Sequence, residues 1–270
     1  MRRWTLDDIP WQRFDAARLD PELVKLAKTA SLVEANGAAY ARHLCRVFED
    51  DPVFQAAARR WGEEEVQHGN ALGRWAMLAD PGFDFARAIA RFCDGYRIDF
   101  DSGRSRRGSR AGEMVARCMV ETGTSTYYAA LAEAAAEPVL KEICRRIAAD
   151  EVRHYKLFRR KLIETLAREP IGFWRRLSIA VRRIAETGDD ELACAYHAAN
   201  EPALAYDRRR CAGAYARGAS SVYRRHHVVR GVALIFKTID LPAKGRLARA
   251  ASRLAWAIMR YRAVRLVKAA

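Results

Sequence analysis

Glu65-Val66-Gln67-His68 and Glu151-Val152-Arg153-His154 are the two stretches that decide the fold, because both follow the pattern Glu-x-x-His. Random placement of 17 glutamates and six histidines along 270 positions would give only about 0.4 such pairs. An acid, Glu64 or Asp150, precedes each copy, and both copies lie in segments rich in helix-forming residues. The pattern therefore predicts a helical motif that the chain uses twice.

Two further glutamates complete the repeat. Glu34 and Glu121 stand 31 and 30 residues before the two motifs, within runs of small or apolar residues. Residues three apart share a helix face, so the Glu and His of each motif can bind one metal ion, and a glutamate from each partner helix can bridge or complete the site. Four carboxylates and two imidazoles inside a four-helix bundle form the ligand set of a di-iron or di-manganese centre. The predicted metal ligands are Glu34, Glu65, His68, Glu121, Glu151 and His154.

Burial energetics favour a metal site over unpaired acids. Four ionised carboxylates facing an apolar core would destabilise the fold, and two divalent metals would neutralise them. The alternative, that Glu34 or Glu121 faces water, suits each residue alone but not six residues in a repeated frame. Glu64 and Asp150 lie four residues before a predicted histidine ligand, so each could orient an imidazole or could be a solvated acid.

Other side chains near the motifs are expected to pack around the site. Cys118 and Tyr128 lie one and two turns from Glu121 and should face the bundle interior, where Tyr128 packs or donates a hydrogen bond. Trp61 and Trp75 fall on the motif-bearing face of their helix. The remaining histidines have no partner at ligand spacing and are expected to be surface or satisfied core residues: His43, His197, His226 and His227.

The rest of the chain is also expected to be helical. Breaks in the helical pattern divide residues 20–168 into five expected helices, and residues 83–100 are expected to supply the crossover between two helical hairpins. These breaks are Asp51-Pro52, Asp80-Pro81-Gly82, Asp101-Ser102-Gly103, Glu137-Pro138 and Glu169-Pro170. Further helices are expected near 172–187, 190–216, 219–236 and 243–268. The predicted fold is all-α: a four-helix bundle in residues 1–170 and a basic helical extension in residues 171–270 that packs on it.

Composition and charge exclude several classes of protein. Half of the residues are apolar and 30% are charged, which excludes intrinsic disorder. No apolar run approaches the roughly 20 residues of a membrane-spanning helix, which excludes an integral membrane protein. Residues 171–270 hold 20 Lys and Arg against 7 Asp and Glu, and so carry +13 of the net charge of +15. This excess favours an anionic partner such as nucleic acid, a membrane surface or an acidic carrier protein, unless it is only a solvated face.

The cysteines and the N-terminal residues indicate the compartment. Six cysteines stand singly and are predicted to be buried free thiols, because no Cys-x-x-Cys pair is present to bind zinc or an iron–sulfur cluster. Asp7, Asp8 and Pro10 stand where a signal peptide would have its apolar core, so we expect a cytoplasmic protein.

The segment 243–268 has an apolar stripe between arginines. This pattern is typical of a helix packed on the bundle or lying on a membrane surface, and the first is the expectation here. The stripe consists of Leu247, Ala251, Leu254, Ile258 and Tyr261.

Both motifs resemble the metal-binding helices of plant and bacterial acyl-carrier-protein desaturases. Residues 61–72 resemble the first of these helices, including a tryptophan four residues before the ligand glutamate, and residues 137–154 resemble the second more closely. The likeness covers about residues 30–165 and implies a ferritin-like bundle with the six ligands given above. It also implies that Thr124 matches a threonine associated with dioxygen activation, and that Asp150 matches an acid hydrogen-bonded to a ligand histidine.

The resemblance implies a function and its partners. Two iron ions, with manganese as the alternative, would activate dioxygen to desaturate or hydroxylate an organic substrate, for which an acyl thioester is the candidate. Such a protein takes electrons from an external donor, and the family analogy implies an acidic acyl-carrier protein as partner and a homodimer. The alternative is an iron-binding bundle that is non-catalytic, or weakly active as a ferroxidase or peroxidase, with a basic surface for anionic partners. A tRNA-modifying di-iron hydroxylase is a third interpretation.

Overall fold

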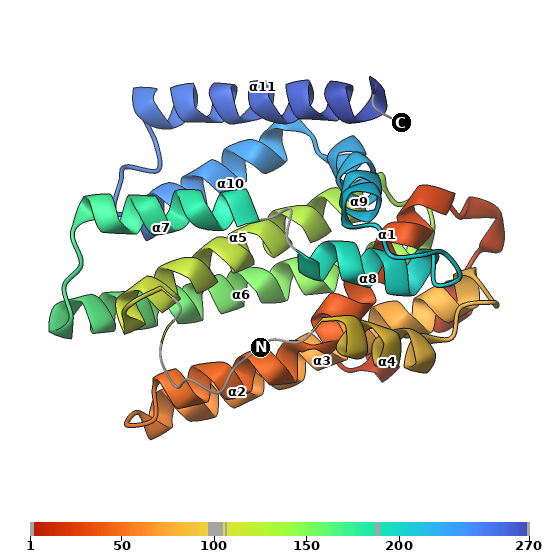
Figure 1. Ribbon diagram of the computed structural model, residues 1–270, viewed down its shortest axis with the longest axis horizontal. Helices are drawn as coiled ribbons and strands as arrows, with labels where there is room; N and C mark the ends of the chain where they lie inside the picture. Colours follow the sequence, from red (N-terminus) through yellow and green to blue (C-terminus); the bar gives the residue numbers. More distant parts are fainter. Residues whose placement is uncertain (1–2, 97–104, 106, 187–189, 269–270) are drawn as a thin grey trace.

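The computed structural model describes residues 3–96, 105, 107–186 and 190–268, and helices make up most of this part of the chain (Figure 1). Across these described residues there is no strand, so the predicted all-α class is confirmed. Three short 3-10 helices open the chain, at Leu6–Asp8, Trp11–Arg13 and Ala16–Arg18.

The long helices form a bundle of two hairpins. α1 packs on α3 and is continued by α2, which also packs on α3, while α5 packs along α6. Contacts between α3 and α6 join the two hairpins. The bounds are Pro21–Ala35 for α1, Gly37–Val47 for α2, Pro52–Ala79 for α3, Arg110–Ala134 for α5 and Pro138–Arg168 for α6.

Local capping chemistry sets the starts of three of these helices. Asp20, Asp51 and Glu137 each precede a proline, and their carboxylates accept hydrogen bonds from the backbone N–H groups of the first turn. Proline suits the first helical position because its fixed φ is already helical and the missing N–H has no partner there. The Asp-Pro and Glu-Pro breaks predicted from the sequence at Pro52 and Pro138 are therefore confirmed.

Two of the predicted helices are interrupted. The first breaks at Asn36, between α1 and α2, where Gly37 lies so close to α3 that an added Cβ would overlap the Cβ of Glu65. The predicted helix 190–216 ends at Asn200, because Pro202 follows and Asp207 caps a new helix. Residues 97–100 of the expected crossover, and the break at residues 101–103, lie outside the described residues.

Six further helices of the described residues cover the bundle (Figure 1). α7 and α10 pack on α5, α8 packs on α1, α4 and α9, and α11 lies outermost on α10 and α9. Their bounds are Phe85–Gly95 for α4, Phe173–Ala185 for α7, Asp190–Asn200 for α8, Arg208–Val222 for α9, Arg225–Thr238 for α10 and Arg246–Lys268 for α11.

The contact face of α11 differs from the prediction. Ala248, Ala251 and Trp256 of α11 belong to the apolar cluster that it shares with α10. Leu247 and Leu254 of the predicted stripe are instead 60% and 63% exposed. The helix packs on the chain, but the larger side chains of the stripe face solvent.

Two apolar clusters fill the bundle at different levels. One contains Phe54, Trp61 and Phe158, and the other contains Trp75 and Leu140. Along α3, α5 and α6, the apolar residues of the first cluster and those of the second are separated by buried acids and histidines. These buried acids and histidines form a polar layer between the two apolar clusters.

Candidate metal centre

Six acidic and imidazole side chains meet between the two apolar clusters. They form two overlapping groups, in each of which one ligand atom per residue lies within 4.8 Å of the others. All six are less than one-tenth exposed. The groups are Glu34, Glu65, His68 and Glu151, and Glu65, Glu121, Glu151 and His154. We call these six residues the carboxylate–histidine cluster.

The two motif glutamates are the shared members of the cluster. Oε1 of Glu65 lies 3.0 Å from Nδ1 of His154, and Oε1 of Glu151 lies 3.3 Å from Nδ1 of His68. Each motif thus places its glutamate beside the histidine of the other motif. Glu34 belongs to only one of the two groups, with its Oε2 3.6 Å from Nδ1 of His68.

The donor set fits metal ions. Seven buried oxygen and nitrogen atoms of the cluster have no hydrogen-bond partner among the described residues. Buried polar atoms without partners are rare, and their clustering here, with carboxylates and imidazoles as the only donors, is what a site for divalent metals requires. The atoms are Oε2 of Glu34, Oε1 of Glu65, Nδ1 of His68, both carboxylate oxygens of Glu121, Oε1 of Glu151 and Nδ1 of His154.

The second nitrogen of each imidazole is held by an acid from the opposite motif. Nε2 of His68 lies 3.1 Å from Oδ2 of Asp150, and Nε2 of His154 lies 2.6 Å from Oε2 of Glu64. Each acid is therefore placed to orient an imidazole, as the sequence allowed, but the imidazole is that of the opposite motif and not the one four residues later on its own helix. The pairing crosses between α3 and α6, and it leaves each Nδ1 directed at the cluster.

A layer of donors outside the imidazoles stabilises these two acids as carboxylates. Trp4 Nε1 donates to Asp150 at 2.8 Å, and the Trp4 ring stacks on His68 with 5.9 Å between centroids. Arg153 pairs with both Asp150 and Glu64. Burial alone would raise the pKa of Asp150, but hydrogen bonds from His68 and Arg153 outweigh it and lower that pKa. For Glu64, the hydrogen bond with His154 and the charges of His154, Arg3 and Arg153 outweigh burial and lower its pKa. Trp4 had no sequence signal, because it lies 146 residues from its partner.

Two hydroxyl groups fix individual carboxylates of the cluster. Thr124 Oγ1 donates to Oε2 of Glu151 at 2.5 Å. Tyr128, 1% exposed, donates to Oε1 of Glu34 at 2.5 Å, so the expected interior position of this tyrosine is found together with a specific partner. Both hydrogen bonds leave the other oxygen of the carboxylate to face the cluster.

Proton sharing within the cluster follows from its burial. Burial and the neighbouring Glu151 carboxylate raise the pKa of Glu121 to about 8, and burial with Glu151 and Glu34 raises that of Glu65 well above its usual range. Burial opposes the charged form of His68, but the adjoining carboxylates, Asp150 first, raise its pKa well above the usual histidine value. Without metal, the cluster therefore retains protons that the unfolded chain would release.

The remaining predicted residues have structural partners. Cys118 is buried, and burial raises the pKa of its thiol. Trp61 meets His154 edge-on with 6.5 Å between centroids, whereas Trp75 donates to Glu137 at 2.7 Å. The prediction of buried thiols is wrong for Cys93, which is exposed on the short helix α4.

The histidines outside the motifs are not members of the cluster, although His43 lines the cavity that Glu34 and Glu65 also line. His226 and His227 meet Glu133 at 2.8 and 3.2 Å, a partner that the sequence spacing did not indicate. Nδ1 of His227 accepts the backbone N–H of Arg224, so neutral His227 carries its proton on Nε2, the nitrogen facing Glu133. That tautomer disfavours metal binding by the separate group of Glu133, His226 and His227. His197 contacts the carbonyl of Leu204 at 2.8 Å.

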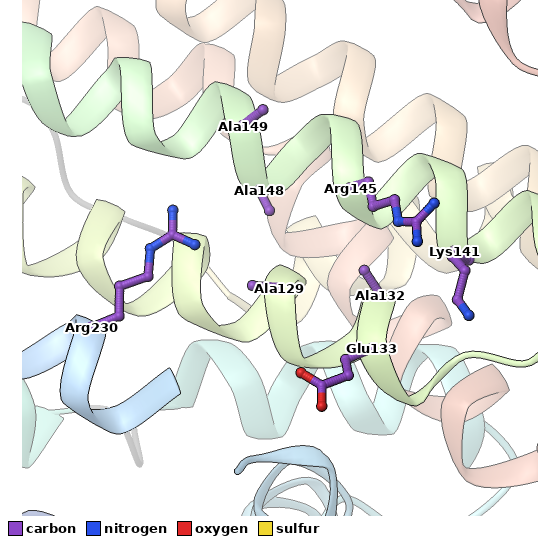
Figure 2. A pocket seen from close by; sticks show the side chains of 8 residues that line it. All are labelled: Ala129, Ala132, Glu133, Lys141, Arg145, Ala148, Ala149 and Arg230. Atoms are coloured by element: carbon purple, nitrogen blue, oxygen red, sulfur yellow. The ribbon is translucent and has the colours of Figure 1, made fainter. Parts of the chain in front are cut away.

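Two cavities differ in their relation to the cluster. A cavity of about 170 Å³ includes Glu34, Glu65 and Thr124 in its wall and so adjoins the cluster. A larger one, of about 480 Å³, lies among α5, α6 and α10 and has none of the six residues in its wall. Figure 2 shows the latter, with Arg145 and Arg230 on opposite sides of small alanine side chains. The chemistry of the cluster therefore belongs with the smaller cavity.

Fold and site together define an all-α protein whose bundle encloses acid–histidine groups able to hold metal. Residues 39–186 match the fatty acid desaturase family, and this match covers more than half of the chain. The chain belongs to the fatty acid desaturase family. A search of curated proteins finds no match. None of the described helices is both long enough and apolar enough to cross a membrane.

Proposed function

We propose that the protein is a ferritin-like di-iron oxidoreductase that activates dioxygen to desaturate or hydroxylate an organic substrate. The observation that carries the proposal is the set of seven buried atoms of the carboxylate–histidine cluster that find no hydrogen-bond partner in the described part of the chain. Membership of the fatty acid desaturase family supports oxidative chemistry and an electron donor. An acyl thioester is the substrate class that the sequence resemblance suggests.

The cluster divides naturally between two metal ions. Glu34 and His68 would hold one ion and Glu121 and His154 the other, with Glu65 and Glu151 shared. Iron is the proposed metal and manganese the alternative, because both accept mixed carboxylate and imidazole ligands. Bound iron would supply the redox chemistry with dioxygen.

The surrounding residues have separate tasks. Thr124 hydrogen-bonds Glu151 and also lines the adjoining cavity, so its hydroxyl can hold or pass a proton at the boundary between cluster and substrate. Asp150 and Glu64 keep the imidazoles oriented. The apolar clusters on either side of the polar layer keep bulk water from it.

Electrons and partners come from outside the cluster. Reduction of dioxygen to water takes more electrons than desaturation of a substrate releases, so an external donor is required.

We further propose that residues 1–170 form the catalytic bundle and that residues 171–270 form a basic extension. This extension would bind an anionic partner, for which an acidic acyl-carrier protein is one candidate. A cytoplasmic homodimer is the assembly that the sequence resemblance suggests.

The test is metal content per chain after anaerobic loading with Fe(II), followed by optical spectra on addition of oxygen. Wild type should bind two irons per chain and give an oxygen-dependent absorption band. Glu121→Ala should lose iron and band, whereas Glu142→Ala, which removes a half-buried acid of α6 paired with Arg146, should keep both. If wild type does not bind two metal ions per chain, the di-iron proposal is refuted.

A second candidate function is iron binding with weak ferroxidase or peroxidase activity at an anionic surface. The observation in its favour is α11, whose residues 246–268 include no acid and which exposes Leu247, Leu254, Ile258 and Tyr261. Substrate separates the two candidates: an oxidoreductase couples oxygen consumption to an oxidised organic product, whereas a ferroxidase consumes oxygen in proportion to added Fe(II).

A further inference from the structure

The larger cavity, which lies among α5, α6 and α10, is separate from the carboxylate–histidine cluster, whose six residues are not in its wall. Its volume of about 480 Å³ falls within the roughly 300–1,000 Å³ of typical small-molecule sites. Short side chains from α5 and α6 form one part of the wall, which we call the alanine floor: Ala129, Ala132, Ala148 and Ala149. Because these side chains end at Cβ, a ligand can lie close to both helices.

Cations from two helices line the rest of this cavity. Lys141 and Arg145 belong to α6 and Arg230 to α10, and Figure 2 shows Arg145 and Arg230 on opposite sides of the alanine floor. In the described part of the chain, none of these three side chains has a hydrogen-bond or ion-pair partner. Lys141 and Arg145 are four residues apart on one helix, so their like charges repel each other, and a bound anion would relieve that repulsion.

The acid in this wall already has cationic partners outside it. The carboxylate of Glu133 lies 3.1 Å from Nε of Arg224, and 2.8 and 3.2 Å from Nε2 of His226 and His227. These partners stand at the start of α10 and are not in the cavity wall. Lys141, Arg145 and Arg230 against this one paired acid leave the cavity with a net positive charge.

The distribution of these cations favours phosphate groups over carboxylates. A phosphate ester carries a charge of about −1.5 to −2 near pH 7 and has three acceptor oxygens. Lys141 and Arg145 together match that charge on one side of the alanine floor, whereas a carboxylate carries a single negative charge. Across the floor, Arg230 presents a planar set of N–H donors that suits a second phosphate.

We propose that this cavity binds a compact organic molecule with two phosphate groups, one held by Lys141 and Arg145 and the other by Arg230, with its carbon skeleton over the alanine floor. The wall has no large apolar side chain that would enter a lipid layer, which favours a soluble phosphate ester over a lipid headgroup. The inference does not depend on the proposed function, because the site contains no residue of the carboxylate–histidine cluster.

Isothermal titration calorimetry on the full chain tests binding, at about 0.15 M salt so that non-specific attraction between charges is screened. The probe is fructose 1,6-bisphosphate, compared with fructose 6-phosphate, fructose, and hexanedioate, which has a carboxylate at each end. The bisphosphate should bind at least about tenfold more tightly than the monophosphate or the dicarboxylate, because each of these makes fewer charged hydrogen bonds. Fructose should not bind.

Charge-removing variants make the test specific to the two phosphate positions. Arg230→Gln should remove most of the preference for the bisphosphate over the monophosphate, and Lys141→Gln with Arg145→Gln should do the same. Controls matched in charge are Arg160→Gln alone and Arg160→Gln with Arg60→Gln, at exposed positions outside the wall, and both should bind as wild type. None of the substituted side chains is buried, and circular dichroism checks that each variant is folded.

A further pair of variants changes the shape of the cavity without changing its charge. Ala149→Leu fills part of the alanine floor and should weaken binding of the bisphosphate. Ala167→Leu, at an exposed position of α6 outside the wall, is the control and should leave binding unchanged.

Three outcomes overturn the inference. The first is that wild type binds the monophosphate or hexanedioate as tightly as the bisphosphate. The second is that the folded charge-removing variants keep full affinity for the bisphosphate. The third is that these variants lose binding only to vesicles containing phosphatidylglycerol, which would assign the cations to a lipid headgroup instead of a soluble ester.

Discussion

At the scale of single residues, the cluster depends on side chains that are not themselves predicted ligands. Asp150 holds the imidazole of His68 and is in turn held by Trp4 and Arg153. Such partners fix which imidazole nitrogen carries the proton, and so determine which nitrogen is free for a metal. Here the fixed nitrogen is Nε2 and the free one is Nδ1.

Replacement of Asp150 should therefore weaken metal binding without removing a ligand. We expect Asp150→Asn to lower the affinity for Fe(II) by about 10- to 100-fold, because the amide is a poorer acceptor for the imidazole N–H. Competition against a chelator of known affinity measures the change. Glu142→Gln, on the same helix but half-buried and paired with Arg146, is the matched control and should keep wild-type affinity. An equal loss in both variants would contradict a positioning role for Asp150.

The raised pKa of Glu121 makes the stability of the metal-free protein depend on pH. Its folded-state pKa is about 8, against 4.5 for the unfolded chain, so the folded state keeps a proton that the unfolded chain releases. This contribution to stability is complete below about pH 4.5 and is lost as the pH rises through about 8. The raised pKa values of Glu65 and His68 act in the same direction.

We expect the melting temperature of metal-free wild type to fall between about pH 5 and pH 8, and to fall less in Glu121→Gln. Each unit of pKa difference corresponds to about 1.4 kcal/mol, so the loss is on the order of a few kcal/mol. Differential scanning calorimetry across this range measures it. Metal should remove most of the decline in wild type, since bound ions replace the protons, whereas Glu121→Gln, which lacks this predicted ligand, should gain little from metal. A parallel decline in both metal-free proteins would refute the role of Glu121.

At the scale of elements, close helix packing sets the spacing of the cluster. Gly69 follows His68 on α3, and a Cβ added there would lie 2.6 Å from the backbone N of Ala35 and 2.8 Å from the carbonyl oxygen of Ser31. Ala35 follows Glu34 on α1. Contact between the backbones of α1 and α3 therefore fixes the separation of two predicted ligands.

Gly69→Ala should push α1 away from α3 and lower stability by about 1–3 kcal/mol, with a loss of iron binding. Gly123→Ala on α5 is the matched control, because a Cβ there would meet nothing within 4 Å. That substitution should raise stability by about 0.5–1 kcal/mol through helix propensity. Thermal melts and iron content of the two variants test the argument, and a stabilised Gly69→Ala with full iron content would refute it.

The elements also show what the sequence could and could not predict. Helix starts at Pro52 and Pro138 were predictable because capping acids and proline act within a single turn. The convergence of six residues followed from helix periodicity in a repeated frame. The break at Asn36 depends on the approach of α3, and the pairing of Asp150 with His68 depends on the rotation of α6 against α3. Neither the break nor this particular pairing follows from a local sequence pattern.

At the scale of the whole molecule, the positive charge and the exposed apolar side chains coincide. α11 is the outermost helix in Figure 1, and its sequence has five arginines between residues 246 and 262 and no acid up to residue 268. Its larger apolar side chains include Leu254 and Ile258, which are 63% and 45% exposed. A basic helix with an exposed apolar stripe is suited to an anionic lipid surface, where both features contribute to binding.

The last prediction separates lipid binding from simple charge attraction. Wild type should co-sediment with vesicles containing phosphatidylglycerol, less so at high salt, and weakly with neutral phosphatidylcholine vesicles. Leu254→Ser with Ile258→Ser should reduce binding to the anionic vesicles at least about tenfold, because two apolar side chains no longer enter the lipid. Val53→Ser with Leu78→Ser, which alters exposed side chains of α3, is the control. Unchanged vesicle binding in the α11 variant, together with salt-sensitive binding of tRNA, would indicate that the arginines act alone and that the anionic partner is a nucleic acid.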